Sequence, residues 1–531
     1  MANLNKTQNS AAKPPKDKRN LKYGTLSVTV TIIFVVLVIV LNIIMTSLSS
    51  VYGWYTDMTS TGFFSLSDSF TEQLDDLLNP EGGAPVYMNV VLMCEEDYFS
   101  NYGTYAPYIY RTLKELVATF DNINLVAYNT TIHPELAEKY KTTALDTPAL
   151  DDIIFELCDE NGNAILGVPA KKYTSASFFA SNAENGELIG YNAEKRILSA
   201  VALLTGKVEK PTAYYLQGHG EPTLAEAPEW REVLELAGFN VQEINLAVED
   251  FESKNSADNI VIINCPKYDL TSAADFSEVK KLRTFLGTNY GNMIVVEDAS
   301  IPTLPALEGL LSEWGLGFGS SVTDTVHSIS GSGAGKLFAD YAQTYVLTSA
   351  TTQSMETQIL SKIFGDTTTN LPNTVFTTPK EVIVSDKTNV ISGVNASKST
   401  FSLLKTYNTA TTTNADGSIK QGSSTMLGVS RIIWEMNSDE ISYVVALGSA
   451  DFLSTEYEKS CANRDVMFEV LNLMWDNTVS FRNIDYKEFD DTSLTDVSTA
   501  AANTWTILCV AVIPVIIAGL GVFVYVRRRH S

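Results

Sequence analysis

The chain has 531 residues, of which 45% are apolar and 19% charged. This length allows two or three domains, and this balance excludes an intrinsically disordered chain. The net charge of −25 at pH 7 excludes nucleic acid as a partner, because an acidic protein repels its phosphates.

Two long apolar runs without charged residues predict transmembrane helices at residues 25–47 and 505–526. Each has about the ~20 residues needed to cross the lipid bilayer. Lysines and arginines fill the tails at 1–24 and 527–531, so the positive-inside rule predicts that both termini are cytoplasmic. The central region is then extracytoplasmic, and the protein a multi-pass protein of the cell membrane. A cleaved signal peptide is the alternative for the first run, but no Ala-x-Ala cleavage site follows it.

The region after the first run, residues 48–208, has the pattern of a small α/β domain. It shows apolar strands at 85–93 and 123–128 around a helix at 106–120, which has Ile109, Leu113 and Leu116 on one face. Hairpin signals follow at Asn161-Gly162, between 153–157 and 164–168, and at Asn185-Gly186. A helix at 194–205 ends the domain. This β-α-β-β-β-α order predicts a thioredoxin-like domain.

The cysteines do not form a functional motif. Cys94, Cys158, Cys265 and Cys461 are far apart and include no C-x-x-C pair, so the sequence predicts neither a zinc site nor a redox site. Whether any of them form disulfides is left open. We expect no metal and no cofactor.

A second domain is predicted at residues 209–482, where short apolar strands alternate with helices. The strands are Thr212–Leu216, Asn240–Leu246, Ile260–Asn264, Met293–Val296 and Ile441–Leu447, and the helices lie near 229–237, 275–287, 304–313 and 463–475. This alternation predicts a mostly parallel, doubly wound sheet with right-handed crossovers. The Thr-, Ser- and Gly-rich stretch 320–435 interrupts it as a β-rich insertion. An acidic linker is expected at 483–504 before the second membrane helix.

The chain's best candidate site is the turn that follows the first strand of this second domain. Gly218, His219, Gly220 and Glu221 come directly after Thr212–Leu216, and α/β sheets bind ligands at the carboxyl ends of their strands. Asp451 follows the last strand of the sheet, so it is expected at the same edge. These five residues are the candidate contacts for a ligand or a protein partner.

Three interpretations of His219 and Glu221 compete. They could bind a metal or small ligand, perform acid–base catalysis, or satisfy backbone groups at the turn. Zinc requires three or four protein ligands, and His133 and His327, the other histidines of the central region, lie in no motif. The structural interpretation is favoured. Cys265 lacks glycines on both sides and is expected to be structural rather than a nucleophile.

Several motifs resemble the GldG-like family, the auxiliary components of ABC-type transport systems known from bacterial gliding motility. The most specific is Tyr214–Glu221. The other matching positions are Phe64-Ser65-Leu66-Ser67, Glu194, Cys265–Leu270, Pro305–Leu311, Gly315-Leu316, Gly448–Leu453, Asn463-Arg464-Asp465, Asn472 and Trp475. Cys265 departs from the family pattern, and Gly287-Thr288-Asn289-Tyr290-Gly291 stands where a richer glycine stretch is usual.

The resemblance implies a thioredoxin-like unit followed by a class I glutamine-amidotransferase-like unit. It also implies a non-catalytic auxiliary subunit that works beside an ABC-2-type permease and its cytoplasmic ABC ATPase in the lipid bilayer. The family has no established catalytic residues to transfer. Two alternatives remain: an envelope hydrolase or amidase using His219 and Glu221, and a structural scaffold of an envelope complex.

Overall fold

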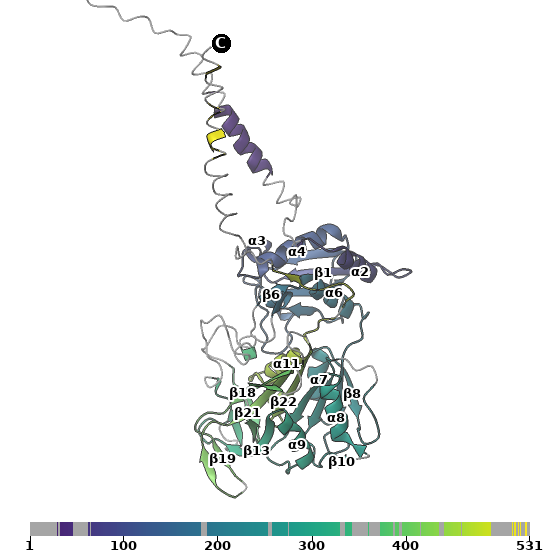
Figure 1. Cartoon of the computed structure of the whole chain (residues 1–531), viewed down its shortest axis with the longest axis vertical. Coiled ribbons are helices and arrows are strands. Elements are labelled where there is room, and N and C mark those ends of the chain that lie inside the picture. The colour runs from purple at the N-terminus through teal and green to yellow at the C-terminus, as the bar shows by residue number, and fades with distance from the viewer. Residues whose placement is uncertain are drawn as a thin grey trace, which may run out of the picture.

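The structure is a computed structural model, shown in Figure 1. It describes residues 32–45, 62–63, 65–181, 188–252, 257–273, 276–329, 335–341, 359–360, 372–385, 388–391, 396–414, 416–434, 440–457, 459–479 and 481–489, together with residues 29, 512, 514–516, 519, 521 and 526–527. Within these residues the protein has a mixed α/β fold with several sheets and two large hydrophobic cores.

The predicted membrane segments are only partly described. Residues 32–45 form a helix, whereas most of 505–526 and all of the tail at 1–24 lie outside the described residues. Apolar side chains of the helix are exposed, with Phe34 at 65% and Ile43 at 61%. Among the described residues, no helix combines the length and the apolar character required to cross a membrane.

The smaller core contains helices α2 (Asp68–Leu78), α4 (Ala106–Thr119) and α6 (Ala193–Leu204). They pack on a sheet with the order β2-β1-β3-β4, which comprises β1 (Tyr87–Leu92), β2 (Ile123–Ala127), β3 (Ile153–Cys158) and β4 (Lys171–Tyr173). The predicted apolar face of α4 is confirmed, because Ile109, Leu113 and Leu116 are fully buried. We call this part of the molecule, with residues 481–489, the smaller unit.

The predicted hairpin at Asn161-Gly162 is wrong in its second strand. The turn is present, with Gly162 at φ +82°, but after it only Ala164 bridges back to Cys158. Strand β4, seven residues further on, pairs with β3 instead. The Asn185-Gly186 signal lies outside the described residues, between β5 (Phe179–Ser181) and β6 (Leu188–Tyr191).

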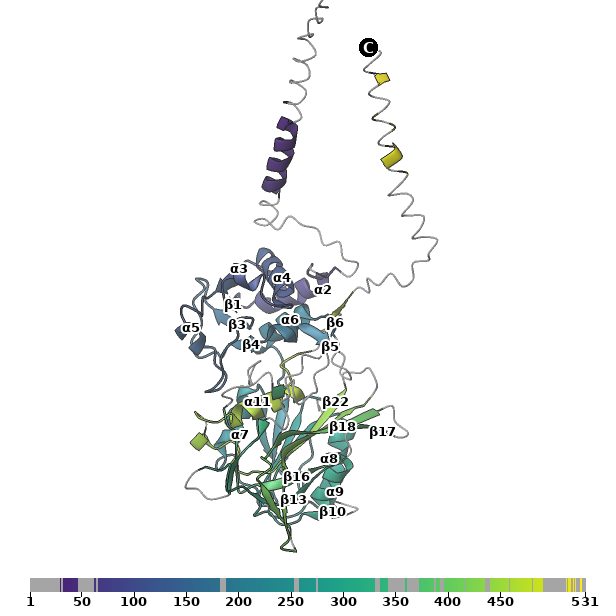
Figure 2. The ribbon, with the colours of Figure 1, turned by 90° about the vertical axis from the view of Figure 1, so that its left-hand side faces the viewer.

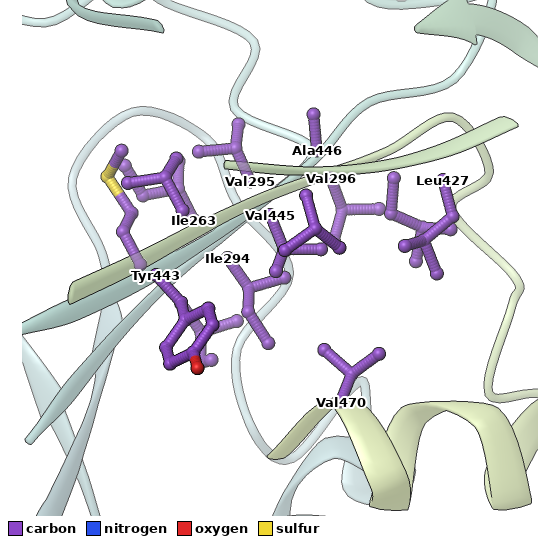
Figure 3. Packing of buried hydrophobic residues seen from close by; sticks show 14 of the residues in the cluster. Ile263, Ile294, Val295, Val296, Leu427, Tyr443, Val445, Ala446 and Val470 are labelled. Atoms are coloured by element: carbon purple, nitrogen blue, oxygen red, sulfur yellow. The ribbon is translucent and has the colours of Figure 1, made fainter. Parts of the chain in front are cut away.

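The larger unit is built on an eight-stranded sheet with the order β17-β18-β21-β22-β12-β9-β7-β8. Five neighbouring strands are parallel: β7 (Thr212–Leu216), β8 (Asn240–Ile244), β9 (Ile260–Asn264), β12 (Asn292–Val296) and β22 (Ile441–Leu447). Figure 3 shows Ile263, Ile294 and Val445 of three of these strands packed together, with Val470 of α11 (Asn463–Met474) nearby.

Helices cover both faces of this sheet (Figure 2). Helix α7 (Pro228–Leu236) contacts α11 on one face, and α8 (Glu278–Gly287) contacts α9 (Pro305–Glu313) on the other. Three antiparallel strands from the predicted insertion extend the same sheet: β17 (Thr388–Ile391), β18 (Ala396–Lys405) and β21 (Thr425–Ile433). The described part of the stretch 320–435 is therefore β-rich, but much of that part continues the main sheet because β21 pairs along the whole of β22.

Other described residues of the stretch contribute to a two-stranded sheet of β14 (Lys336–Phe338) with β15 (Val375–Thr377) and to a four-stranded sheet of order β16-β13-β19-β20. The strands of the four-stranded sheet are β13 (Leu316–Thr323), β16 (Lys380–Val384), β19 (Thr411–Thr413) and β20 (Ile419–Gln421).

After α11 the chain returns to the smaller unit. Arg196 of α6 binds Asp476 at 2.6 Å, Ile484 is buried in the smaller core, and β23 (Lys487–Glu488) pairs with β6. Residues 484–488 therefore belong to a folded unit, although the sequence suggested a linker from residue 483. The apolar side chain of Ile484 provides the burial that attaches this acidic and polar stretch to the smaller core.

A polar contact, which we call the chain-end clasp, joins the two ends of the smaller unit. It consists of Ser67, Glu194 and Lys487. Ser67 donates its backbone N–H and its hydroxyl to Glu194, at 2.8 and 2.6 Å. The Lys487 ammonium lies 2.7 Å from the same carboxylate and also donates to the carbonyl of Gly62 at 2.9 Å. The beginning and the end of the described body are thus held to one side chain of α6.

Candidate functional site

The order of the parallel strands identifies where a ligand site would be expected. Strand β8 lies on one side of β7, and β9, β12 and β22 follow on the other. This is the 2-1-3-4-5 order of doubly wound sheets, whose ligands bind in the crevice where the winding reverses. The crevice of this chain would lie between the carboxyl ends of β7 and β9, which lead into the Gly218–Glu221 turn and into Cys265.

The Gly218–Glu221 turn fills this position with the protein's own atoms. The carbonyl of His219 accepts hydrogen bonds from the backbone N–H groups of Lys267, at 2.7 Å, and Tyr268, at 2.9 Å. Gly220 has φ +81°, and a Cβ there would lie 3.1 Å from the Cβ of Lys267. Only a glycine therefore fits this approach between the two loops without strain.

The imidazole of His219 lies between two carboxylates. Its Nδ1 is 3.1 Å from Glu221, and its Nε2 is 3.0 Å from Glu278, the first residue of α8. The three residues are only 6%, 7% and 2% exposed. Each carboxylate is also held by the backbone: Glu221 accepts from the N–H of His219 at 2.6 Å, and Glu278 from that of Thr271 at 2.8 Å.

This environment shifts the pKa values of His219 and Glu278. Burial alone would lower the pKa of His219, but its hydrogen bonds to Glu221 and Glu278 outweigh burial and raise the pKa to about 9. Burial also opposes ionisation of Glu278, yet the Thr271 N–H and His219 lower the pKa of that carboxyl. His219 is therefore a cation at neutral pH that donates both ring N–H groups to carboxylates.

Such a histidine has no lone pair to offer. A general base or a metal ligand needs an unprotonated ring nitrogen, and both nitrogens of His219 are already committed. In the described part of the chain, no group of three or more histidine, cysteine, aspartate or glutamate side chains is placed to hold a metal ion. The arrangement can fasten the turn to the start of α8, which agrees with the structural interpretation of these residues.

Asp451 is not part of this cluster. It is exposed and follows β22. No hydrogen bond or ion pair among the described residues joins it to His219 or Glu221. Its charge acts on Cys265, where burial first, and then Asp298, Glu297 and Asp451, raise the pKa of the thiol. The structure thus brings together four of the five predicted site residues and separates Asp451 from them.

Cys265 has an unusual backbone conformation that the sequence did not predict. Its φ is +50°, in the left-handed region, directly after β9, where nucleophilic cysteines sit in some α/β enzymes. Its side chain is nevertheless buried, and its raised pKa keeps the thiol protonated, whereas a nucleophile needs the thiolate. The backbone at Cys265 is therefore strained, but its thiol is not activated as a nucleophile.

Sequence reasoning missed Glu278 and a second buried ion pair. Glu297 follows β12, is fully buried, and binds the ammonium of Lys380 at 2.6 Å. Burial raises the pKa of Glu297 to about 7, even though Lys380 opposes the shift. An acidic residue immediately after an apolar strand was the signal that could have identified Glu297. For Glu278 the only sequence signal was its position at the start of a helix.

One cavity of the described structure lies beside the chain-end clasp, far from the His219 turn. Phe63, Thr112, Tyr191 and Lys487 are among its lining residues. It has room for about one water molecule, so it is not a substrate pocket.

Comparisons with known proteins add little to this geometry. No family model matches the chain, and neither does any curated protein. Among solved structures, an exo-beta-1,4-mannosidase from Opitutaceae bacterium strain TAV5 is 11% identical over 78% of this chain, with a TM-score of 0.25; the match spans only 56% of the mannosidase. A proposed component of GMP synthase from Thermoplasma acidophilum is 12% identical over 50% of this chain and 95% of its own length, with a TM-score of 0.24. At these scores neither likeness bears on fold or function.

Proposed function

We propose that this chain is a membrane-anchored, extracytoplasmic auxiliary subunit of an ABC-2-type transport system. It belongs to the GldG-like family, lacks ATPase and other catalytic activity, and works beside a permease and a cytoplasmic ABC ATPase. Its smaller unit is thioredoxin-like and its larger unit resembles class I glutamine amidotransferases. Residues 25–47 and 505–526 span the cell membrane and leave both termini in the cytoplasm.

The observation that carries the membrane anchoring is the helix at 32–45. Its exposed side chains are almost all apolar, Phe34 and Ile43 among them. A helix that is apolar all round is typical of burial in lipid or in another protein. The lysines and Arg19 before residue 25 favour lipid, with this end of the chain in the cytoplasm.

The closed turn at His219 supports a non-catalytic role. At the position where sheets of this order normally bind ligands, backbone hydrogen bonds join residue 219 to residues 267–268. The histidine there is charged and doubly hydrogen-bonded, and Cys265 is held as a thiol. An envelope hydrolase or amidase would need at least one of these groups free and unprotonated. The transport role itself is supported by the matching motifs, above all Tyr214–Glu221.

Co-purification tests the proposal. The full chain, carrying an affinity tag, is extracted from its native membranes in mild detergent, and the proteins bound to it are identified. We expect a polytopic permease and an ABC ATPase in near-stoichiometric amounts. The matched control lacks residues 1–47 and should lose the first anchor. Recovery of the full chain from membranes without a permease or an ATPase would contradict the transport role and favour the scaffold alternative.

A further inference from the structure

Tyrosine and phenylalanine side chains gather at one end of the smaller unit. We call this cluster the aromatic end; it consists of Tyr98, Tyr102, Tyr105, Tyr108 and Phe489. Tyr98 of α3 (Glu96–Phe99) is 52% exposed, Tyr108 of α4 is 38% exposed and Phe489 is 37% exposed, while Tyr102 and Tyr105 are half-buried. The rings of Tyr98 and Tyr102 lie 5.3 Å apart.

Two buried rings beneath the surface connect three members of the aromatic end: Tyr105, Tyr108 and Phe489. Phe63 contacts Tyr108 at 5.9 Å between ring centroids and stacks on Phe489 at 5.5 Å. Phe179 contacts Tyr105 at 4.9 Å and Tyr108 at 6.1 Å. The exposed rings of Tyr108 and Phe489 are therefore packed on a buried aromatic layer. The Tyr98–Tyr102 pair lies beside them because α3 contacts α4.

The aromatic end lies where the chain enters and leaves the folded body. Phe63 is among the first described residues of the smaller unit, and Phe489 is the last. In Figures 1 and 2, α3 and α4 lie on the side of the smaller unit that faces the helix at 32–45, away from the larger unit. Two attachment points at the same end limit which face of the unit can turn toward the membrane.

From this placement we propose that the aromatic end rests on the lipid headgroup region of the membrane. The inference builds on the membrane anchoring proposed above and names the surface that meets the bilayer. Tyrosine suits this position because its ring is apolar and its hydroxyl can stay in contact with water, which is why tyrosines are enriched at membrane interfaces.

The charges around the aromatic end indicate the kind of lipid. The exposed acidic residues Glu95 and Asp97 precede Tyr98. Lys114 is partly neutralised, because it lies 3.3 Å from Glu96, which also accepts from Tyr110 at 2.8 Å. No basic cluster among the described residues of this end attracts anionic lipids, so the contact depends on the rings and suits zwitterionic headgroups.

Site-specific fluorescence tests the contact. Full-length protein with Cys509→Ser carries one environment-sensitive label at Tyr98→Cys, Tyr268→Cys or Val40→Cys, in nanodiscs of phosphatidylcholine that include a headgroup spin-labelled phosphatidylcholine as quencher. Cys94, Cys158, Cys265 and Cys461 are buried, so they do not compete for the label. Tyr268 is the matched control, because it is 70% exposed and precedes β10 (Ser272–Ala273), which Figure 1 places at the opposite end of the molecule.

We expect the spin label to quench position 98 at least about threefold more than position 268, as an interfacial side chain requires. Equal quenching at 98 and 268, with strong quenching at Val40 by an acyl-chain spin label, would overturn this inference alone. Absence of quenching at Val40 would overturn the anchoring and this inference with it. A photo-crosslinker at position 98 that captures the permease in native membranes, with position 98 unquenched in nanodiscs, would replace the lipid surface with a protein partner.

Discussion

The His219 turn of the larger unit and the chain-end clasp of the smaller unit solve a similar problem in different ways. Each uses a buried glutamate to bind a cation and backbone N–H groups at once: Glu278 in the turn and Glu194 in the clasp. The turn joins two loops at one edge of a sheet. The clasp joins the two ends of the folded chain, because Lys487 donates to the carbonyl of Gly62, 425 residues earlier. Buried carboxylates therefore serve in this molecule as fasteners, and neither cluster requires a ligand to explain it.

The largest effect is expected from removing the cation of the turn. His219→Ala leaves Glu221 and Glu278 buried without their shared partner, and such a loss costs about 3–5 kcal/mol of unfolding free energy. Urea unfolding followed by tryptophan fluorescence measures it. The control is His133→Ala, because His133 pairs with Glu135 in an exposed position and should matter little. Unchanged stability with lost function would instead revive the enzyme alternative.

The same turn predicts a loss of stability at alkaline pH. The pKa of His219 is raised from 6.5 to about 9 in the folded protein. Between pH 6.5 and pH 9 unfolding releases a proton from His219. The stability that charged His219 contributes is therefore complete below pH 6.5 and is lost as the pH rises through 9. The loss is about 3 kcal/mol, measured by denaturation across this range. A His219→Gln variant should show a flatter profile; identical profiles would contradict the charged histidine.

Breaking the chain-end clasp should lower the free energy of unfolding by less, and its effect should be more local. Lys487→Met removes the ammonium from Glu194 and from the carbonyls of Gly62 and Ser65. We expect a loss of about 1.5–3 kcal/mol of unfolding free energy, as for hydrogen bonds to charged groups. Hydrogen exchange should rise in residues 481–489 while the core of the larger unit stays protected. Lys114→Met is the matched control, since its pair with Glu96 is half-exposed. Equal effects of the two variants would mean that the clasp is only a surface ion pair.

The smallest change in stability is expected from a substitution that tests the contact between the Gly218–Glu221 turn and the loop after β9. Gly220 and Gly417 both have φ +81°, but a Cβ would meet Lys267 only at Gly220. Both alanine variants carry about 1–2 kcal/mol of backbone strain. Gly220→Ala should cost about 1 kcal/mol more, because overpacking adds its own penalty. A difference near zero in urea unfolding would show that the two loops are not closely packed.

Local patterns in the sequence predicted the elements around the site well. The strand Thr212–Leu216 is as expected, and the helix expected at 229–237 is α7 at Pro228–Leu236. Helix α8 starts at Glu278, later than expected, because Ser277 caps it. Glycines and apolar periodicity are local signals, so they identify strands, turns and helices from a few residues.

What the sequence did not reveal depends on contacts between distant residues. Glu278 lies 59 residues from His219, and no spacing rule connects them. Asp451 was expected near His219 because both follow strands of one sheet, but β9 and β12 lie between β7 and β22. The pairing of β21 with β22, which merges the insertion with the main sheet, likewise depends on strand order.

The path of the chain has a mechanical consequence. Because the polypeptide enters through the smaller unit, forms the entire larger unit, and returns to the smaller unit at Asp476, the larger unit is inserted between α6 and β23. A pull applied at both ends of the body would be transmitted through β6, β23 and α6. The eight-stranded sheet would lie outside the path of that tension, so it could stay folded while the strap at 481–489 peels away.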